Sequence, residues 1–146
     1  MEKRVFMKEI RLGTVGSDRT VQHILDKVKE TPGIKLEAIY SKDAGKGHEL
    51  AAAYGCNKVY TDMDWFLGDE EINTLYFAAS AHPDYEQVKD VLLDGRNVIL
   101  ENSSCISPVQ TKELLETAEE SHLFLVMQYE GQDLVSLNAN IECESA

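Results

Sequence analysis

Apolar residues recur along the chain with two alternating periods. In residues 34–40 every second residue is apolar, which is typical of a half-buried strand, whereas residues 21–28 place apolar side chains three or four positions apart, as on one face of a helix. Shorter apolar runs elsewhere are rich in β-branched and aromatic residues, which favour strands. The pattern predicts six strands, at residues 10–15, 34–40, 58–60, 72–79, 98–100 and 123–127.

Helical segments fill the intervals between these strands, and turn residues mark their ends. The first helix ends before Gly33, the second at Gly55 and the fourth at Gly95, and a fifth opens at Ser107-Pro108. Because strands and helices alternate with short connections, the sequence predicts an α/β fold, a doubly wound and mostly parallel sheet of about six strands with helices on both faces. The expected inner face of the fifth helix is Val109, Leu114, Leu115 and Ala118.

Residues 135–144 depart from this alternation, because apolar and polar residues follow one another there without a helical period. The pattern predicts an extra carboxyl-terminal strand. A strand with no following helix has to pair with a sheet edge of its own chain or of a second copy. We therefore expect a domain of residues 1–131, a strand-like tail of residues 132–146, and a homodimer; a frayed tail is the alternative.

Composition narrows the class of protein. The chain has 146 residues and a net charge of -12, with no basic run that would neutralise nucleic-acid phosphates, so we expect no nucleic-acid partner. No apolar run is long enough to span a membrane and the charged start does not resemble a signal peptide, so we expect a cytoplasmic protein. The three cysteines share no close spacing, which argues against a disulfide framework and a cysteine zinc site.

Two glycines stand where the first strand turns into the first helix. Gly13 and Gly16 match a turn in which backbone N–H groups and a helix N-terminus meet the pyrophosphate of a dinucleotide. Asp18 stands where such a turn has its next glycine, and a carboxylate about 5 Å from a phosphate costs on the order of 3 kcal/mol. Arg19 could offset part of this repulsion. The alternative is that Ser17 or Asp18 simply caps the first helix.

Other strand ends are also polar, and open α/β sheets bind ligands at the carboxyl ends of their strands. After the second strand, Ser41 beside Lys42 would favour NADP, Asp43 would favour NAD, and an ordinary loop is the third alternative. His82 could carry a proton, but a lone loop histidine is more often a surface residue, so we predict no catalytic residue and no metal site. The candidate cofactor-binding residues are Gly13, Gly16, Ser17, Asp18, Arg19, Thr20, Ser41, Lys42, Ala79, Ser80, Glu101 and Asn102.

Several segments, in their order and spacing, resemble a known family. They are I-R-L-G-T-V-G, L-E-A-I-Y-S-K-D, I-N-T-L-Y-F-A-A, H-P-D-Y-E-Q-V and L-L-D-G-R-N-V-I-L-E-N. Over about residues 8–130 the chain is similar to the N-terminal Rossmann domain of the Gfo/Idh/MocA oxidoreductases. The resemblance implies NADP or NAD as cofactor and sugars, cyclitols or related alcohols as substrates. It also implies a larger second α/β domain for the substrate, which this chain is too short to contain.

Three motif positions differ from that family. Asp18 replaces a small residue of the first turn, residues 79–81 replace a T-P-N motif, and Glu101, Asn102 and Ser103 match an E-K-P motif whose lysine assists proton transfer. Asparagine can donate a hydrogen bond but cannot carry the proton. We therefore expect weak or lost cofactor affinity and no autonomous dehydrogenase activity. The alternative is a non-catalytic dimeric binding or regulatory module derived from the family.

Overall fold

Strands and helices alternate along the chain in the computed structural model, which describes residues 9–16, 19–101 and 106–128. The strands are β1 (Ile10–Val15), β2 (Ile34–Tyr40), β3 (Val59–Tyr60), β4 (Thr74–Phe77), β5 (Asn97–Glu101) and β6 (Leu125–Gln128). The helices are α1 (Arg19–Glu30), α2 (Ala44–Tyr54), α3 (Met63–Leu67), α4 (Tyr85–Leu93) and α5 (Pro108–Glu120), with a short 3-10 helix at Ala79–Ala81. In the part of the chain that the structure describes, no helix has the length and apolar character of a membrane span.

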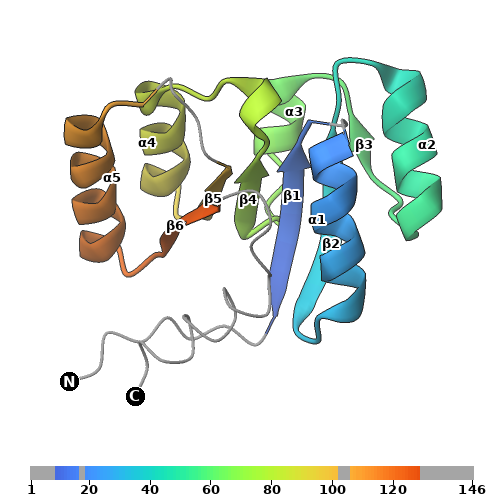
Figure 1. The fold of residues 1–146 in the computed structure, drawn as a ribbon, viewed down its shortest axis with the longest axis horizontal. Helices are drawn as coiled ribbons and strands as arrows, with labels where there is room; N and C mark the ends of the chain where they lie inside the picture. Colours follow the sequence, from blue (N-terminus) through green and yellow to red (C-terminus); the bar gives the residue numbers. More distant parts are fainter. Residues whose placement is uncertain (1–8, 17–18, 102–105, 129–146) are drawn as a thin grey trace.

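The six strands form one parallel sheet in the order β3-β2-β1-β4-β5-β6, so the direction of winding reverses between β1 and β4. Helices α1 and α2 pack on one face, and α3, α4 and α5 pack on the other (Figure 1). This arrangement confirms the doubly wound parallel fold that the sequence predicts. The strand expected within the tail of residues 132–146 lies outside the described residues.

Helix α5 buries a narrower face than its sequence suggests. Leu114 and Ala118 are buried as predicted, but Val109 is 69 % exposed and Leu115 is 45 % exposed, so the prediction was wrong for these two residues. Leu114 and Ala118 are about one helical turn apart and share a face, whereas Leu115 is rotated by about 100° from Leu114. Apolar character alone did not identify which residues of this helix contact the sheet.

The sheet edge at β2 and β3 contains a cluster of partly buried ions. The Nζ atom of Lys58 lies 2.6 Å from Glu37 Oε2 and 3.1 Å from Asp69 Oδ2, and the Tyr60 hydroxyl donates to Asp69 Oδ2 (2.8 Å). The hydrogen bond from Lys58 lowers the pKa of Glu37. Burial alone would raise the pKa of Asp69, but hydrogen bonds from Tyr60, the Glu71 N–H and Lys58 together lower it. The cluster therefore stabilises the fold while both carboxylates are ionised.

Acid should remove this contribution. Both carboxylates have pKa values that folding lowers, so their contribution is complete well above their unfolded values, about pH 4, and is lost as the pH falls through the lowered folded values. We predict that Lys58→Met reduces the free energy of unfolding by about 1–2 kcal/mol at pH 7, less than for a fully buried pair because the Lys58 side chain is 35 % exposed. Urea unfolding at pH 3 should show a smaller difference from wild type.

The matched control for this experiment is Lys35→Met. The Lys35 side chain is 59 % exposed and its Nζ lies 3.5 Å from Glu37 Oε1, so its loss should cost less than about 1 kcal/mol at any pH. A loss in Lys58→Met that is the same at pH 3 and pH 7 would contradict the electrostatic account.

Candidate functional site

The carboxyl ends of β1 and β4 meet where the strand order reverses, and Gly16 lies at their junction. Its N–H donates to the Tyr40 carbonyl (3.0 Å), and its φ is +125°. A Cβ built on Gly16 would lie 3.1 Å from Ala78 Cβ and 3.9 Å from Ser80 Oγ. Glycine adopts such a backbone angle without strain. Its missing side chain also lets the loop after β1 approach the loop after β4.

Gly13 has a different role in the structure. It lies inside β1, where a Cβ would come within 2.9 Å of both Ile72 Cγ2 and Phe66 Cζ. These two side chains belong to the core on the α3 face of the sheet. Gly13 therefore makes room for packing, and of the two glycines it is Gly16 that lies at the strand ends.

Helix α1 begins directly after the first loop. The backbone of Arg19 and Thr20 forms its first turn, while their side chains, together with Ser17 and Asp18, lie outside the description. This helix has 12 residues, and no acidic residue lies in its first turn. The N–H groups at a helix N-terminus carry partial positive charge. Placed at the junction of β1 and β4, this terminus suits an anion such as a phosphate.

The end of β2 combines a buried hydroxyl with exposed cations. Ser41 is 1 % exposed, and its hydroxyl donates to the Asp43 carbonyl (2.8 Å) and accepts from the Asp43 N–H (3.2 Å). The Asp43 carboxylate caps α2 by accepting from the Lys46 N–H (3.1 Å). Lys42 and Lys46 are both exposed. Ser41 and Asp43 thus shape the turn into α2, and the two lysines supply positive charge beside it.

The loop after β4 is a single 3-10 turn, Ala79–Ala81, in which Ser80 is exposed. His82 follows with a φ of +48° and is also exposed. Asp84 caps α4, because its carboxylate accepts from the Gln87 N–H (2.8 Å). Of the polar residues in this loop, Ser80 is therefore the one placed next to Gly16.

At the end of β5 the structure reveals a contact that the sequence analysis missed. The phenol of Tyr76, in β4, donates a hydrogen bond to the carboxylate of Glu101. Tyr76 is fully buried, whereas Glu101 is half-buried. A tyrosine in an otherwise apolar strand was the available signal, since a buried phenol needs a hydrogen-bond partner. The next candidate along the chain, Asn102, lies outside the described residues.

These loops form what we call the strand-end site. It offers a bare backbone turn, a helix N-terminus, two ammonium groups and a carboxylate, which together can hold an anion and accept hydrogen bonds from hydroxyl groups. Within the described ranges, no group of three or more histidine, cysteine or acidic residues is placed to hold a metal ion. The described members of the strand-end site are Gly16, Ser41, Lys42, Lys46, Ser80 and Glu101.

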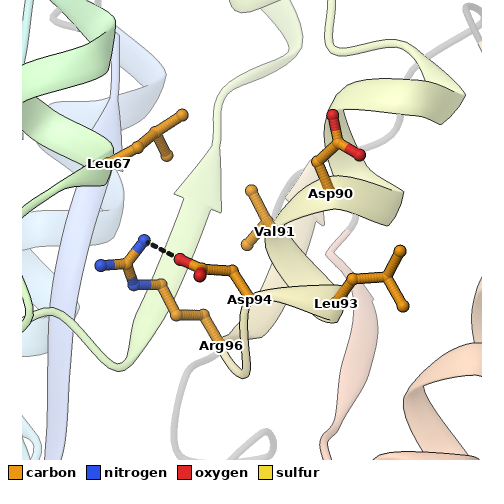
Figure 2. A pocket seen from close by; sticks show the side chains of 6 residues that line it. All are labelled: Leu67, Asp90, Val91, Leu93, Asp94 and Arg96. Atoms are coloured by element: carbon orange, nitrogen blue, oxygen red, sulfur yellow. Dashed lines mark hydrogen bonds and ion pairs between the residues drawn. The ribbon is translucent and has the colours of Figure 1, made fainter.

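An open hollow between α3 and α4 lies away from the strand-end site (Figure 2). It has a volume of about 430 Å³, and its lining includes Arg96, which precedes β5 and so marks the opposite, amino-terminal end of that strand. The Arg96 guanidinium donates to the carbonyls of Ile72 (3.0 Å) and Asp69 (2.9 Å) and pairs with Asp94 (2.9 Å). Arg96 therefore holds the chain before β4 in place. The other lining residues are Leu67, Asp90, Val91, Leu93 and Asp94.

Comparison with known proteins agrees with this geometry. Residues 10–129 match a family described as "Oxidoreductase family, NAD-binding Rossmann fold". The chain is 20 % identical over 117 residues to scyllo-inositol 2-dehydrogenase (NADP(+)) IolU of Bacillus subtilis, a match that covers 80 % of this chain and 36 % of that protein. It is 27 % identical over 93 residues to trans-1,2-dihydrobenzene-1,2-diol dehydrogenase of Xenopus tropicalis, covering 63 % and 28 %. The chain thus spans only about a third of the length of these curated relatives.

Solved structures share the fold. KijD10, a 3-ketoreductase from Actinomadura kijaniata in complex with NADP, matches with a TM-score of 0.73 at 19 % identity, over 93 % of this chain and 44 % of that one. GenD2 from gentamicin A biosynthesis, in complex with NAD, matches with a TM-score of 0.71 at 22 % identity, over 83 % and 34 %. The family match covers most of the chain, and the strand order is that of a dinucleotide-binding sheet. The chain therefore belongs to the Gfo/Idh/MocA oxidoreductase family, and residues 10–129 form its NAD-binding Rossmann domain.

Proposed function

We propose that this chain binds NADP or NAD with reduced affinity and does not catalyse hydride transfer by itself. The observation that carries the proposal is Gly16, a bare residue with positive φ between β1 and the N-terminus of α1. A pyrophosphate-binding turn requires this arrangement, because the backbone has to approach the phosphates closely. The described residues of the strand-end site therefore fit the cofactor that the family uses.

The reduced affinity for the cofactor follows from Asp18. Asp18 lies between Gly16 and α1 in the sequence, and we propose that its carboxylate lies near the pyrophosphate. At about 5 Å and an effective dielectric near 20, the repulsion is on the order of 3 kcal/mol per charge, or about a hundredfold in affinity. Arg19 offsets part of this if its guanidinium reaches the same phosphates.

The end of β2 favours NADP over NAD. Lys42 and Lys46 are exposed beside the N-terminus of α2, where they can neutralise a phosphate on the ribose 2′-oxygen. The carboxylate that would hold the 2′-hydroxyl of NAD is Asp43, and it is engaged as the cap of α2. Among the similar proteins, the name of IolU and the complex of KijD10 specify NADP, whereas the complex of GenD2 contains NAD.

Hydride transfer needs a proton-transferring group and a pocket that holds the substrate, and we propose that this chain supplies neither. When bound, the dinucleotide supplies or accepts the hydride, but Asn102 stands where the family has its proton-transferring lysine, and an amide cannot carry that proton. A substrate must also be held about 3–3.5 Å from the reacting carbon and shielded from water. The chain matches only 36 % of IolU, so we propose that substrate and proton donor come from a further polypeptide segment.

Calorimetric titration of the pure chain with NADPH and NADH tests this proposal. We expect a dissociation constant of about 0.1 mM for NADPH and weaker binding of NADH. Lys42→Ala should weaken NADPH binding about three- to tenfold and leave NADH binding unchanged, because only NADPH carries the 2′-phosphate. Absence of binding at millimolar concentrations would refute a retained cofactor site. Sustained NADPH-dependent reduction of a sugar or aldehyde would refute the lack of catalysis.

Replacement of Asp18 tests the cause of the reduced cofactor affinity. Asp18→Gly should tighten NADPH and NADH binding alike, by up to about a hundredfold, because both share the pyrophosphate. The control Asp90→Asn removes an exposed carboxylate beside the hollow at α4 and should change neither affinity. An unchanged affinity in Asp18→Gly would mean that this side chain points away from the phosphates.

A second function, that of a non-catalytic dimeric module, is favoured by the edge of the sheet. β6 is the last strand of the described order and pairs with β5 on one side. Its outer edge offers backbone groups to a further strand. Residues 135–144 have the alternation of such a strand. We propose that this segment pairs at the β6 edge of a second copy and forms a homodimer.

Light scattering on the full chain and on a chain that ends at residue 131 tests the dimer. We expect a dimer mass for the first and a monomer mass for the second. Ile141→Lys, on the apolar face of the predicted strand, should also give a monomer, whereas the control Asn140→Lys on its polar face should not. A monomeric full chain would refute the proposal.

A further inference from the structure

The hollow between α3 and α4 has an apolar wall that is partly open to solvent. Leu67 comes from α3, and Val91 and Leu93 come from α4 (Figure 2). Leu93 is 63 % exposed, although it directly follows Leu92, which is fully buried. The volume of about 430 Å³ is in the range of cavities that accommodate a small ligand, so the hollow has room for a large side chain. This surface therefore fits an apolar occupant.

The rim of the hollow is acidic. Asp90 is exposed, and the Asp94 side chain is 63 % exposed. Arg96, the cation of the lining, is already bonded to Asp94 and to two backbone carbonyls. The loop between α3 and β4 contributes three further acidic residues, at positions 69–71. An occupant that carries cationic side chains would therefore be complementary to the charge of the rim.

The chain that leads into β1 passes close to this hollow. The Asn73 side chain donates to the Glu9 carbonyl (3.0 Å). The carbonyl of the preceding residue, Ile72, accepts from Arg96 (3.0 Å), which lines the hollow. An extended chain advances about 3.3–3.6 Å per residue, so Phe6, three residues before Glu9, can lie about 10 Å from it. The eight residues that precede Glu9 are therefore long enough to enter the hollow.

Residues 1–8, M-E-K-R-V-F-M-K, combine the two properties that the hollow requires. The three apolar residues at positions 5–7 are consecutive, and three bases against one acid give the segment a net charge of +2. Residues 129–146, by contrast, contain four acids and no base, so the acidic rim would repel them. They also follow β6 at the carboxyl-terminal edge of the parallel sheet, whereas the hollow lies at the amino-terminal end of β5.

We propose that residues 3–7 dock into the hollow of their own chain, with the Phe6 ring between α3 and α4 and a basic side chain beside Asp90. Docking removes the ring and the exposed Leu93 side chain from water, which supplies the driving force. The rim carboxylates add an attraction that salt screens. The docked segment covers the end of the sheet opposite the strand-end site, so the inference is independent of the proposed cofactor binding.

Hydrogen exchange measured by mass spectrometry tests the docking. The N–H groups of Asp94, Gly95 and Arg96 donate to carbonyls of α4 and close the turn beside the hollow. In Phe6→Asp we expect this turn to exchange about three- to tenfold faster than in wild type, because the docked segment no longer holds it closed. Exchange of α2, on the other face of the sheet, should not change. Phe6→Leu keeps an apolar side chain and should retain most of the protection.

Thermal unfolding examines the same contact from both sides. Phe6→Asp and Leu93→Gln should each lower the midpoint by about 2–6 °C. The double variant should unfold no lower than the less stable single variant, because both substitutions remove one contact. The matched control is Val109→Gln, which replaces another exposed apolar residue (69 %) at the start of α5 and should leave the midpoint unchanged.

Charge reversal tests the role of the rim. Lys3→Glu combined with Arg4→Glu should accelerate exchange of the turn as Phe6→Asp does, and the further change Asp90→Lys should restore protection by reversing the charge of the rim as well. An Asp90→Lys variant that restores nothing would refute the contact with Asp90.

Three outcomes would overturn the docking itself. The first is that Phe6→Asp changes neither the exchange of the turn nor the midpoint of unfolding. The second is that the midpoint shifts of Phe6→Asp and Leu93→Gln are additive, which would mean that the two side chains do not meet. The third is that protection of the turn increases with protein concentration, which would assign the hollow to a segment of a second copy. Leu93→Gln carries the test if Phe6→Asp does not fold, as judged by circular dichroism.

Discussion

The reversal of strand order between β1 and β4 is the constraint on which the other features of this domain depend. The helix that follows β1 packs on one face of the sheet, and the helix that follows β4 packs on the other. The carboxyl ends of the two strands therefore lie side by side with their connecting loops leading to opposite faces. The close approach of Gly16 to Ala78 is possible only because the junction contains a residue without a side chain and with a positive φ. The N-terminus of α1, the end of β2 and the end of β5 are all positioned relative to that contact.

The two ends of the sheet serve different purposes. At the amino-terminal end, Arg96 binds the carbonyls of the loop before β4, and along the β2–β3 edge Lys58 neutralises Glu37 and Asp69. Here the polar groups of the described chain satisfy one another, which stabilises a fold. At the carboxyl-terminal end, lysines, a serine and a carboxylate are exposed or half-buried beside a helix terminus. Open α/β sheets bind ligands at this end of their strands.

Fold and chemistry have separate requirements, because the core of the sheet and the residues at its strand ends are different parts of the chain. The sheet depends on apolar periodicity and on small residues at a few positions, such as Gly13 and Gly16. Chemistry depends on single side chains at the strand ends, such as those that the E-K-P motif of the family supplies. A substitution of such a side chain leaves the core untouched.

The sequence by itself determined the order of strands and helices, the helix ends and the class of fold, because periodicity and turn chemistry act within each segment. It also predicted a ligand site at the loops of the strand ends, which stays a prediction. Only the tertiary structure decided that Gly13 packs against Phe66, that Leu115 faces solvent, and that Tyr76 reaches Glu101. The contacts of Gly13 and Tyr76 depend on strand order and register between distant segments, because a shift of one residue turns a strand residue to the other face of the sheet. The exposure of Leu115 depends on which face of α5 packs against the sheet.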